Sequence, residues 1–220
     1  MNTDMKEMTI FNHEKNKIGD KIQTEDREIT IVDKFEEPLV LVLENVLSTE
    51  ECEKLIECSK NRLKRSKIGS SRDENNLRTS SGMFFEEAEN ETIAKIEKRV
   101  SEIMSVPVEH GEGLQILNYK VGQEYKPHLD YFTSKGKPVE NPRISTLVMF
   151  LNDVEEGGAT EFPSLNFSAP PKKGSAVYFE YFYNDTNLNE LTLHAGTPVI
   201  KGEKWVATQF MRRKRVNSRK

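Results

Sequence analysis

The chain has 220 residues, of which 35% are hydrophobic and 31% charged, and a formal net charge of -4. This size fits one globular domain with a proper core better than two large domains. The acidic balance provides no overall basis for binding nucleic acid, and no run reaches the roughly 18 apolar residues of a membrane span. The polar first residues lack the apolar core of a secretory signal, so we expect a cytoplasmic protein.

Residues 1–34 are polar and show no sustained hydrophobic period, apart from a possible strand in "REITIVDKF". We therefore predict an N-terminal arm over residues 1–34 and one folded domain over residues 35–220. An exposed arm often finds a partner chain, which favours a homodimer.

Two helices are predicted before the β-rich part of the chain. Ser48 and Glu51 form the pattern of a capping box after the strand "PLVLVLENV", which predicts a helix over residues 49–63. Apolar residues at helical spacing in "ETIAKIEKRVSEIM" predict a second helix that ends before Pro107. Residues 48–106 thus form helical support, with a loop and a short strand in "RTSSGMFF" between the helices.

From Gly111 onward, short β-rich runs are separated by Gly, Pro, Asn and Asp. The runs are "GLQILNYKV", "YKPHLDYF", "RISTLVMFLNDV", "SAVYFEYF", "LTLHAGTPVI" and "EKWVATQFMRR". Strands without intervening helices indicate an antiparallel sandwich or barrel. We predict an α+β, mainly β fold, in which a jelly-roll core over residues 111–212 has the helices packed on its outside.

Two further features of the sequence have simple interpretations. Cys52 and Cys58 fall in one predicted helix and lack a zinc-binding spacing, so we interpret both as free thiols. The basic tail over residues 213–220 could contact nucleic acid, but the acidic remainder of the chain offers no continuing basic stripe. A solvated C-terminus is the better interpretation.

The stretch "YKPHLDYF" places His128 and Asp130 two residues apart in a chain with four histidines. A His-x-Asp pair alone is a weak motif. On a strand, however, residues i and i+2 point to the same face. The two side chains would then present a nitrogen and an oxygen side by side, as two ligands of one metal do.

A third ligand has to come from another strand, and His194 is the remaining histidine with strand sequence on both sides. His13 lies in the predicted arm and His110 at a turn before the β core, so we interpret both as structural or exposed. Two histidines and one carboxylate form the facial triad that leaves three adjacent positions open on iron(II). A structural zinc site would fill its coordination sphere with cysteines and histidines, so this set favours redox iron chemistry.

Lys204 lies ten residues after His194, at the start of the last predicted strand. Val206, Thr208 and Phe210 follow on the same face of that strand. A cation at the far end of an apolar pocket suits a dicarboxylate that chelates the metal with its near end. The position of Lys204 relative to His194 therefore favours a buried anchor over an ordinary surface lysine.

Three motifs occur in a fixed order, "HLD", then "EEGGATEFP", then "HAGTPVIKGEKWVAT". In this order they resemble the iron(II)- and 2-oxoglutarate-dependent prolyl 4-hydroxylases of the collagen type. The resemblance covers residues 35–212 and is strongest from Gly111 onward. It implies a double-stranded β-helix, or jelly roll, with flanking N-terminal helices.

The resemblance also implies roles for single residues. It implies three Fe(2+) ligands, His128, Asp130 and His194. It further implies that Lys204 anchors the distal carboxylate of 2-oxoglutarate, with hydroxyl support from Tyr119 and Thr160. Without the resemblance, Tyr119 would be a core tyrosine and Thr160 a turn residue.

On the substrate side, the resemblance implies a closing loop and a groove near the iron. The implied contacts are Arg78 and Ser80 in the loop, and Glu112, Tyr125 and Arg143 in the groove. Surface charges and a buried aromatic residue are the alternative interpretations of this set. Phe210 stands where family members often carry a tryptophan, which keeps an aromatic platform but loses a ring N–H donor. We also predict a mobile lid over residues 70–81.

The implied reaction is hydroxylation of peptidyl proline at C4 with O2 and 2-oxoglutarate, which releases succinate and CO2. In the family, ascorbate rescues iron oxidised in uncoupled turnovers. The expected partner is a proline-containing peptide or protein, whose extended conformation suits an open groove, and neither nucleic acid nor membrane. Two alternatives stay open: the same chemistry on another amino acid or small molecule, and a non-catalytic β-barrel module that binds peptide.

Overall fold

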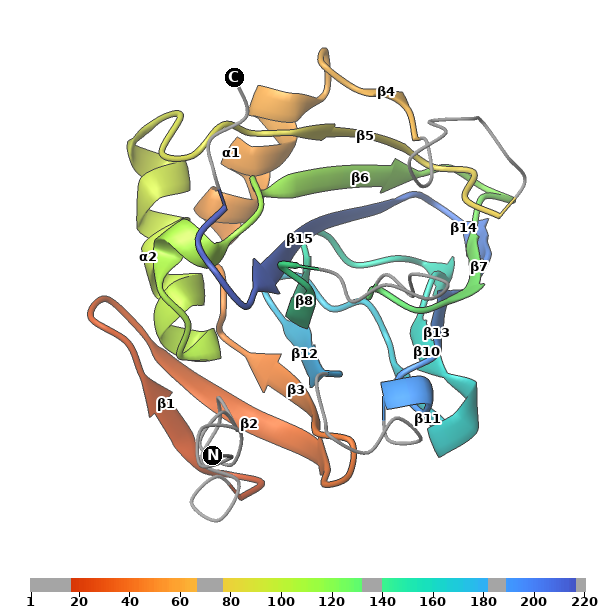
Figure 1. Cartoon of the computed structure of the whole chain (residues 1–220). Coiled ribbons are helices and arrows are strands. Elements are labelled where there is room, and N and C mark those ends of the chain that lie inside the picture. The colour runs from red at the N-terminus through yellow and green to blue at the C-terminus, as the bar shows by residue number, and fades with distance from the viewer. Residues whose placement is uncertain (1–16, 67–76, 132–139, 182–188, 217–220) are drawn as a thin grey trace.

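The computed structural model describes residues 17–66, 77–131, 140–181 and 189–216. Two antiparallel sheets face each other, and the helices cover the outer face of the larger one (Figure 1). The major sheet has nine strands in the order β1-β2-β3-β12-β8-β15-β6-β5-β4, and the minor sheet has the order β11-β10-β13-β7. Strands β14 and β9 form a separate pair. The predicted α+β, mainly β jelly roll is confirmed.

The helices are α1 (Thr49–Ser59) and α2 (Glu91–Met104), with two 3-10 turns, η1 (Val108–His110) and η2 (Pro163–Leu165). The strands are, in chain order, β1 (Lys21–Gln23), β2 (Glu28–Phe35), β3 (Val40–Glu44), β4 (Lys64–Arg65), β5 (Ser81–Phe84), β6 (Gln115–Tyr119), β7 (Tyr125–His128), β8 (Arg143–Phe150), β9 (Glu156–Gly157), β10 (Thr160–Phe162), β11 (Phe167–Ala169), β12 (Ala176–Glu180), β13 (His194–Gly196), β14 (Val199–Lys201) and β15 (Lys204–Arg212).

The described part of the predicted arm belongs to the major sheet. Strands β1 and β2 pair with each other, and β2 also pairs with β3 from Thr30 to Phe35. Ile29 and Ile31 of β2 are fully buried. The boundary predicted at residue 34 therefore does not separate an arm from the domain, while residues 1–16 lie outside the described part of the chain.

Helix α1 begins at the predicted capping box, since Ser48 Oγ accepts from the Glu51 N–H and the Glu51 carboxylate accepts from the Ser48 N–H. The helix ends at Ser59, four residues before the predicted end. The Ser59 hydroxyl donates to the carbonyls of Leu55 and Ile56, which competes with the helical pattern. Helix α2 has the predicted bounds.

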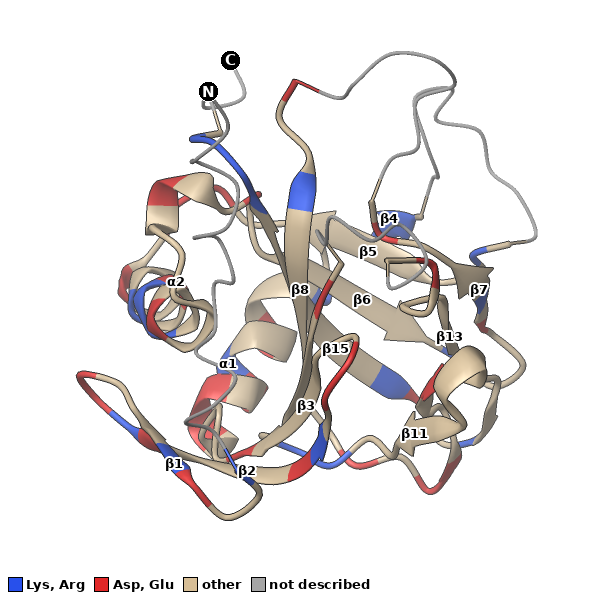
Figure 2. Ribbon diagram, turned by 60° about the horizontal axis from the view of Figure 1, so that its bottom comes forward, with Lys and Arg blue, Asp and Glu red and all other residues tan. Residues whose placement is uncertain are grey.

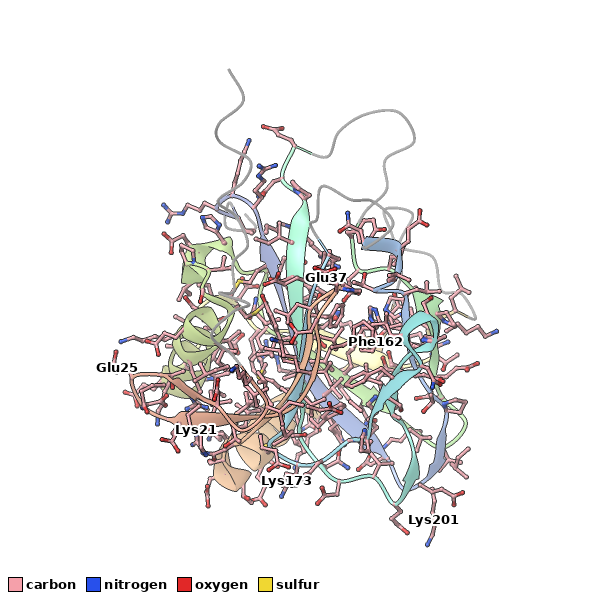
Figure 3. The ribbon with its side chains drawn as sticks, turned by 90° about the horizontal axis from the view of Figure 1, so that it is seen from below. Lys21, Glu25, Glu37, Phe162, Lys173 and Lys201 are labelled. Carbon is pink, nitrogen blue, oxygen red and sulfur yellow. The ribbon has the colours of Figure 1, made fainter. Side chains whose placement is uncertain are left out.

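Two hydrophobic cores lie on the two faces of the major sheet. The outer core packs α1 and α2 against the sheet and includes Ile96, Val100 and Leu147. The inner core lies between the two sheets and is richer in aromatic residues, among them Phe150, Phe162 and Phe179. Figure 3 shows Phe162 inside the molecule, whereas the labelled lysines point away from it.

Positions of Lys and Arg are interspersed with positions of Asp and Glu along the described chain (Figure 2). Among the residues that the structure describes, no helix is long and apolar enough to cross a membrane. Both cysteines are free, and burial raises the pKa of the Cys52 thiol to about 11.

Candidate metal centre

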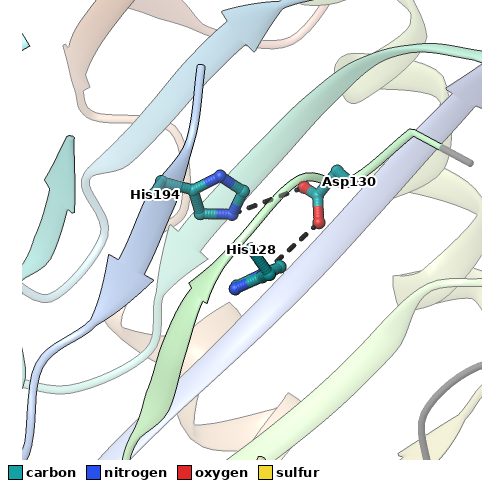
Figure 4. A group of neighbouring side chains, drawn as sticks. All are labelled: His128, Asp130 and His194. Atoms are coloured by element: carbon teal, nitrogen blue, oxygen red, sulfur yellow. Dashed lines mark ion pairs between the residues drawn. The ribbon is translucent and has the colours of Figure 1, made fainter. Parts of the chain in front are cut away.

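Strands β7 and β13 of the minor sheet bring two histidines together. His128 ends β7, His194 begins β13, and the two residues are direct partners in the antiparallel pair. The prediction placed Asp130 on the same strand as His128. In the structure Asp130 lies two residues beyond the end of β7. Its carboxylate lies 3.5 Å from His128 Nε2 and 3.6 Å from His194 Nε2 (Figure 4). One ligand atom from each residue lies within 4.8 Å of the others, as binding of a single ion requires.

Both imidazoles are oriented by backbone carbonyls. His128 Nδ1 lies 2.8 Å from the Lys126 carbonyl oxygen, and His194 Nδ1 lies 3.0 Å from that of Thr192. A carbonyl can only accept, so Nδ1 of each ring carries the proton and Nε2 is left with its lone pair. Each Nε2 faces the Asp130 carboxylate, which is the arrangement found in metal-binding histidines.

The electrostatics of the group suit a cation. Burial lowers the pKa of His194 to about 4, which keeps its ring neutral at physiological pH. Burial raises the pKa of Asp130, but the fields of His194, His128 and Arg143 outweigh it and hold that pKa below its ordinary value. A neutral imidazole at His194 and an ionised carboxylate at Asp130 are the protonation states that a metal requires of these ligands.

Two side chains of β8 contact Asp130. The Thr146 hydroxyl lies 2.9 Å from Asp130 Oδ2, and Arg143 Nη1 donates to the Asp130 carbonyl at 3.1 Å. Thr146 Oγ1 also lies 3.0 Å from the Tyr181 hydroxyl. Neither Thr146 nor Tyr181 was predicted to belong to the site, because each stands in an ordinary strand sequence with no spacing signal.

Lys204 begins β15, as predicted, and is 3% exposed. Its Nζ lies 5.7 Å from the ring centre of Tyr119 and 5.5 Å from that of Phe150. Among the described residues no carboxylate forms an ion pair with it, and burial lowers the pKa of Lys204 to about 7. A buried, unpaired ammonium between aromatic walls suits the carboxylate of a ligand.

A glycine on the strand that begins with His194 lies close to Lys204. Gly196 follows His194 by two residues on β13, and a Cβ at Gly196 would lie 3.8 Å from Lys204 Nζ. Tyr119 is the direct partner of Lys204 across β6 and β15, and Thr160 is the partner of Gly196 across β10 and β13. The residues predicted for 2-oxoglutarate are therefore neighbours on strands of the two sheets.

Arg143, Glu112 and Phe210 form one cluster beside Asp130. Arg143 donates through Nε and Nη2 to the two carboxylate oxygens of Glu112, each at 2.7 Å, and its guanidinium lies 3.6 Å from the centre of the Phe210 ring. Arg212 Nε also donates to Glu112 at 2.8 Å. Burial raises the pKa of Glu112, but the two arginines outweigh it and lower it. Glu112 thus holds Arg143 in place, which differs from the predicted direct contact with substrate.

Tyr125 and Arg78 lie on the other side of His128. The Tyr125 ring stacks on the His128 ring, with centroids 3.4 Å apart, and the Arg78 guanidinium lies 5.0 Å from the Tyr125 ring. Arg78 Nε is buried and has no hydrogen-bond partner among the residues that the structure describes. Ser80 is fully buried, and its hydroxyl lies 2.9 Å from that of Ser66 on the side of β4. The structure therefore brings Tyr125 and Arg78 to the centre but turns Ser80 away from it.

The predicted lid over residues 70–81 lies partly outside the described residues. The described part runs along β7, where Thr79 N–H donates to the Glu124 carbonyl and Lys126 N–H to that of Leu77.

A separate cavity of about 760 Å³ lies between the start of α2 and the end of β15, lined by Glu97 and Gln209 among others. Its lining includes none of the three predicted metal ligands, so it is not the chemical centre.

Comparisons with known proteins agree with this geometry. The model of the 2OG-Fe(II) oxygenase superfamily matches residues 114–212. "Probable prolyl 4-hydroxylase 10" of Arabidopsis thaliana is 42% identical over 201 residues, which cover 80% of this chain and 69% of that protein. "Prolyl 4-hydroxylase 5" of the same plant is 40% identical over 199 residues, 79% of this chain and 68% of that one.

Solved structures show the same relationship. The viral collagen prolyl hydroxylase of Paramecium Bursaria Chlorella virus-1, in its 2OG complex, superimposes with a TM-score of 0.66 at 33% identity, over 79% of this chain and 95% of that chain. A Trichoplax adhaerens prolyl hydroxylase, bound to a fragment of a hypoxia inducible factor, has a TM-score of 0.60 at 16% identity, over 78% of this chain and 82% of that chain. That second likeness shows the fold alone.

Proposed function

The chain belongs to the prolyl 4-hydroxylases of the 2OG-Fe(II) oxygenase superfamily, and from this premise we propose the role of each residue at its centre. The protein is a 2-oxoglutarate-dependent iron(II) dioxygenase with prolyl 4-hydroxylase activity. Bound iron(II), with 2-oxoglutarate and O2, supplies the oxidising power to hydroxylate an unactivated C–H bond, which no side chain can do alone.

His128, Asp130 and His194 hold the iron in this proposal. Two observations carry it: these three side chains converge, and Lys204 is buried with no carboxylate partner among the described residues. Two Nε2 lone pairs and one carboxylate oxygen would hold iron(II) as a 2-His-1-carboxylate set, the ligand type of iron(II) oxygenases. Lys204 then binds the distal carboxylate of 2-oxoglutarate, and Tyr119 and Thr160 lie on neighbouring strands.

The inner core excludes water from the proposed 2-oxoglutarate site. Phe150, Phe162 and Phe179 are fully buried, and the last two pack against the His194 ring at 5.5 and 4.7 Å between centroids. Exclusion of water strengthens the attraction between Lys204 and a carboxylate. It also protects the oxidising species from side reactions.

The substrate side of the proposal is a proline-containing peptide or protein that lies against Tyr125, Arg143 and Phe210. Tyr125 offers an aromatic ring directly beside an iron ligand, and a proline ring packs well on such a surface. Arg143 has its guanidinium fixed by Glu112 and Phe210. Arg78 adds a cationic group over Tyr125, whereas Ser80 is left out because its hydroxyl faces Ser66.

Three finer predictions accompany this proposal. Ascorbate would rescue iron oxidised without substrate, two chains would form a homodimer, and the protein would reside in the cytoplasm. The two free cysteines agree with a reducing compartment. Ascorbate dependence of turnover, the mass in solution and the location of a tagged chain test the three predictions separately.

The test of the proposed roles is succinate release with a panel of proline peptides, together with the peptide mass. Wild-type protein should add one oxygen per succinate, whereas Asp130→Ala should lose both products and the bound iron. Lys172→Ala serves as the control for Lys204→Ala, because Lys172 is exposed and pairs with Glu44. Succinate without peptide oxidation would favour another substrate, and peptide binding without succinate would favour a non-catalytic module.

A further inference from the structure

A chain of hydrogen bonds lies behind Asp130. Thr146 stands in the middle of β8 and is fully buried, between Phe179 of β12 and Phe210 of β15. Its single hydroxyl contacts both Asp130 Oδ2, at 2.9 Å, and the hydroxyl of Tyr181, at 3.0 Å. Tyr181 is 1% exposed.

The direction of each hydrogen bond in this chain follows from its members. A carboxylate that binds a metal is ionised and can only accept, so Thr146 donates its one proton to Asp130 Oδ2. The Thr146 oxygen is then left as an acceptor, and Tyr181 has to donate to it. The order is Tyr181 to Thr146 to Asp130, and every hydroxyl proton in it has a defined place.

We propose that Thr146, itself oriented by Tyr181, is a positioning residue that makes Asp130 bind the metal through one oxygen only. The two carboxylate oxygens are otherwise alike, since Oδ1 lies 3.5 Å from His128 Nε2 and Oδ2 lies 3.6 Å from His194 Nε2. The Thr146 hydroxyl holds Oδ2 and leaves Oδ1 as the ligand atom.

The consequence concerns the number of open positions. A carboxylate that chelates through both oxygens fills four of six positions together with two histidines, so only two are left. The keto acid end of 2-oxoglutarate needs two positions and O2 needs a third. Single-oxygen binding by Asp130 therefore keeps the position that O2 requires.

The location of Thr146 makes it a rigid support. A β-branched side chain has few rotamers on a strand, and both neighbouring strands are paired along the whole region. Tyr181 is held as well, since its ring packs on Phe179 and on Tyr131, the residue next to Asp130. The chain therefore links the central strand to the segment that carries the ligand.

The test uses cobalt(II) bound to the metal-free protein, because its visible spectrum reports the number and geometry of ligands. Thr146→Val keeps the shape but removes the hydroxyl, and it should change the spectrum and weaken cobalt binding by about 10–100-fold, as loss of an outer partner of a ligand does. Thr146→Ser keeps the hydroxyl and should restore both. Ser145→Ala is the matched control, because Ser145 is equally buried on the opposite face of β8 and its hydroxyl has no partner in the described part of the chain.

Tyr181→Phe supplies an independent variant in case Thr146→Val does not fold, which circular dichroism would show. It should shift the spectrum in the same sense by a smaller amount, because Thr146 keeps its proton but loses its orientation. A cobalt spectrum that is unchanged in Thr146→Val, or in Tyr181→Phe where only that variant folds, overturns the proposal. The proposal rests on the metal site described above. If His194→Ala binds cobalt as tightly as the wild type does, that metal site is overturned instead.

Discussion

Buried cations on the two faces of the major sheet differ in whether carboxylates pair with them. On the outer face, Arg99 of α2 is 1% exposed, and its guanidinium is bound by the carboxylates of Asp26 and Glu51 and by the Val46 carbonyl. On the inner face, Lys204 is 3% exposed, and no carboxylate among the described residues pairs with it.

The pKa values express the same contrast. Burial lowers the pKa of Arg99, but its bonds to Asp26 and Glu51 outweigh burial and raise it. Burial alone acts on Lys204 and lowers its pKa to about 7. A buried cation that is paired with carboxylates supports the fold. A buried cation without a carboxylate partner lowers the stability of the folded protein and can bind an anionic ligand.

Arg99→Met tests the outer face and should have the largest effect on stability. It leaves Asp26 and Glu51 with only the looser contacts of Lys95 and Arg27, and removal of one partner of a buried pair costs about 3–5 kcal/mol. We expect the lower end of this range, because the Asp26 side chain is 23% exposed. Urea unfolding measures the loss. Lys95→Met is the control, since exposed Lys95 contacts the same Asp26 at 3.4 Å and should cost less than about 1 kcal/mol.

Lys204→Met tests the inner face and should separate ligand affinity from stability. Loss of a buried charged partner costs a ligand about 2–5 kcal/mol, so titration calorimetry should show affinity for 2-oxoglutarate reduced by at least about 30-fold. The ligand-free protein should become more stable by about 1 kcal/mol, because the unpaired ammonium is gone. A ligand-free variant less stable than wild type would show that Lys204 supports the fold as Arg99 does.

The fold was largely predictable because its long strands and both helices have clear patterns. Helix α2 and the capping box of α1 follow directly from the sequence. Strands β9, β10 and β11 have two or three residues each, too few to show an alternation. The place of β2 in the sheet was missed because charged residues interrupt its apolar pattern, although it forms a hairpin with β3.

The chemical centre was predictable only where residue type carries the signal. Histidine is rare in this chain, so a His-x-Asp pair with one later histidine stands out. Thr146, Tyr181 and Arg99 act through contacts between segments far apart in the sequence, and threonine, tyrosine and arginine are ordinary in strands and helices. Only the three-dimensional arrangement shows their partners.

The pH dependence of 2-oxoglutarate binding sharpens the contrast between the two cations. Lys204 has a lowered pKa of about 7 before the ligand binds, so above pH 7 its side chain is mostly the neutral amine, which has to take up a proton in order to bind a carboxylate. Affinity should fall by up to about tenfold per pH unit above 7. Between pH 7 and the ordinary lysine pKa the unfolded chain binds the extra proton, so this group makes ligand-free stability rise with pH.

Calorimetry under anaerobic conditions from pH 6.5 to 9 measures this slope, with Lys204→Arg as the matched control. An arginine stays charged over the whole range, and it should abolish the slope even if it binds 2-oxoglutarate less well. A slope that Lys204→Arg leaves intact would mean that another group titrates, and the assignment of the anchor to Lys204 would be wrong.

Phe210→Trp should have the smallest effect and concerns the substrate end of the inner face. The Arg143 guanidinium lies 3.6 Å from the Phe210 ring centre, and tryptophan is the best aromatic partner for a cation, in a contact worth about 0.5–1 kcal/mol. The indole also adds an N–H donor near the groove. We therefore expect KM for a proline peptide to fall about threefold, with kcat and 2-oxoglutarate affinity unchanged. Arg143→Lys removes the planar partner and should cancel this gain, whereas an equal gain on both backgrounds would place the added contact away from Arg143.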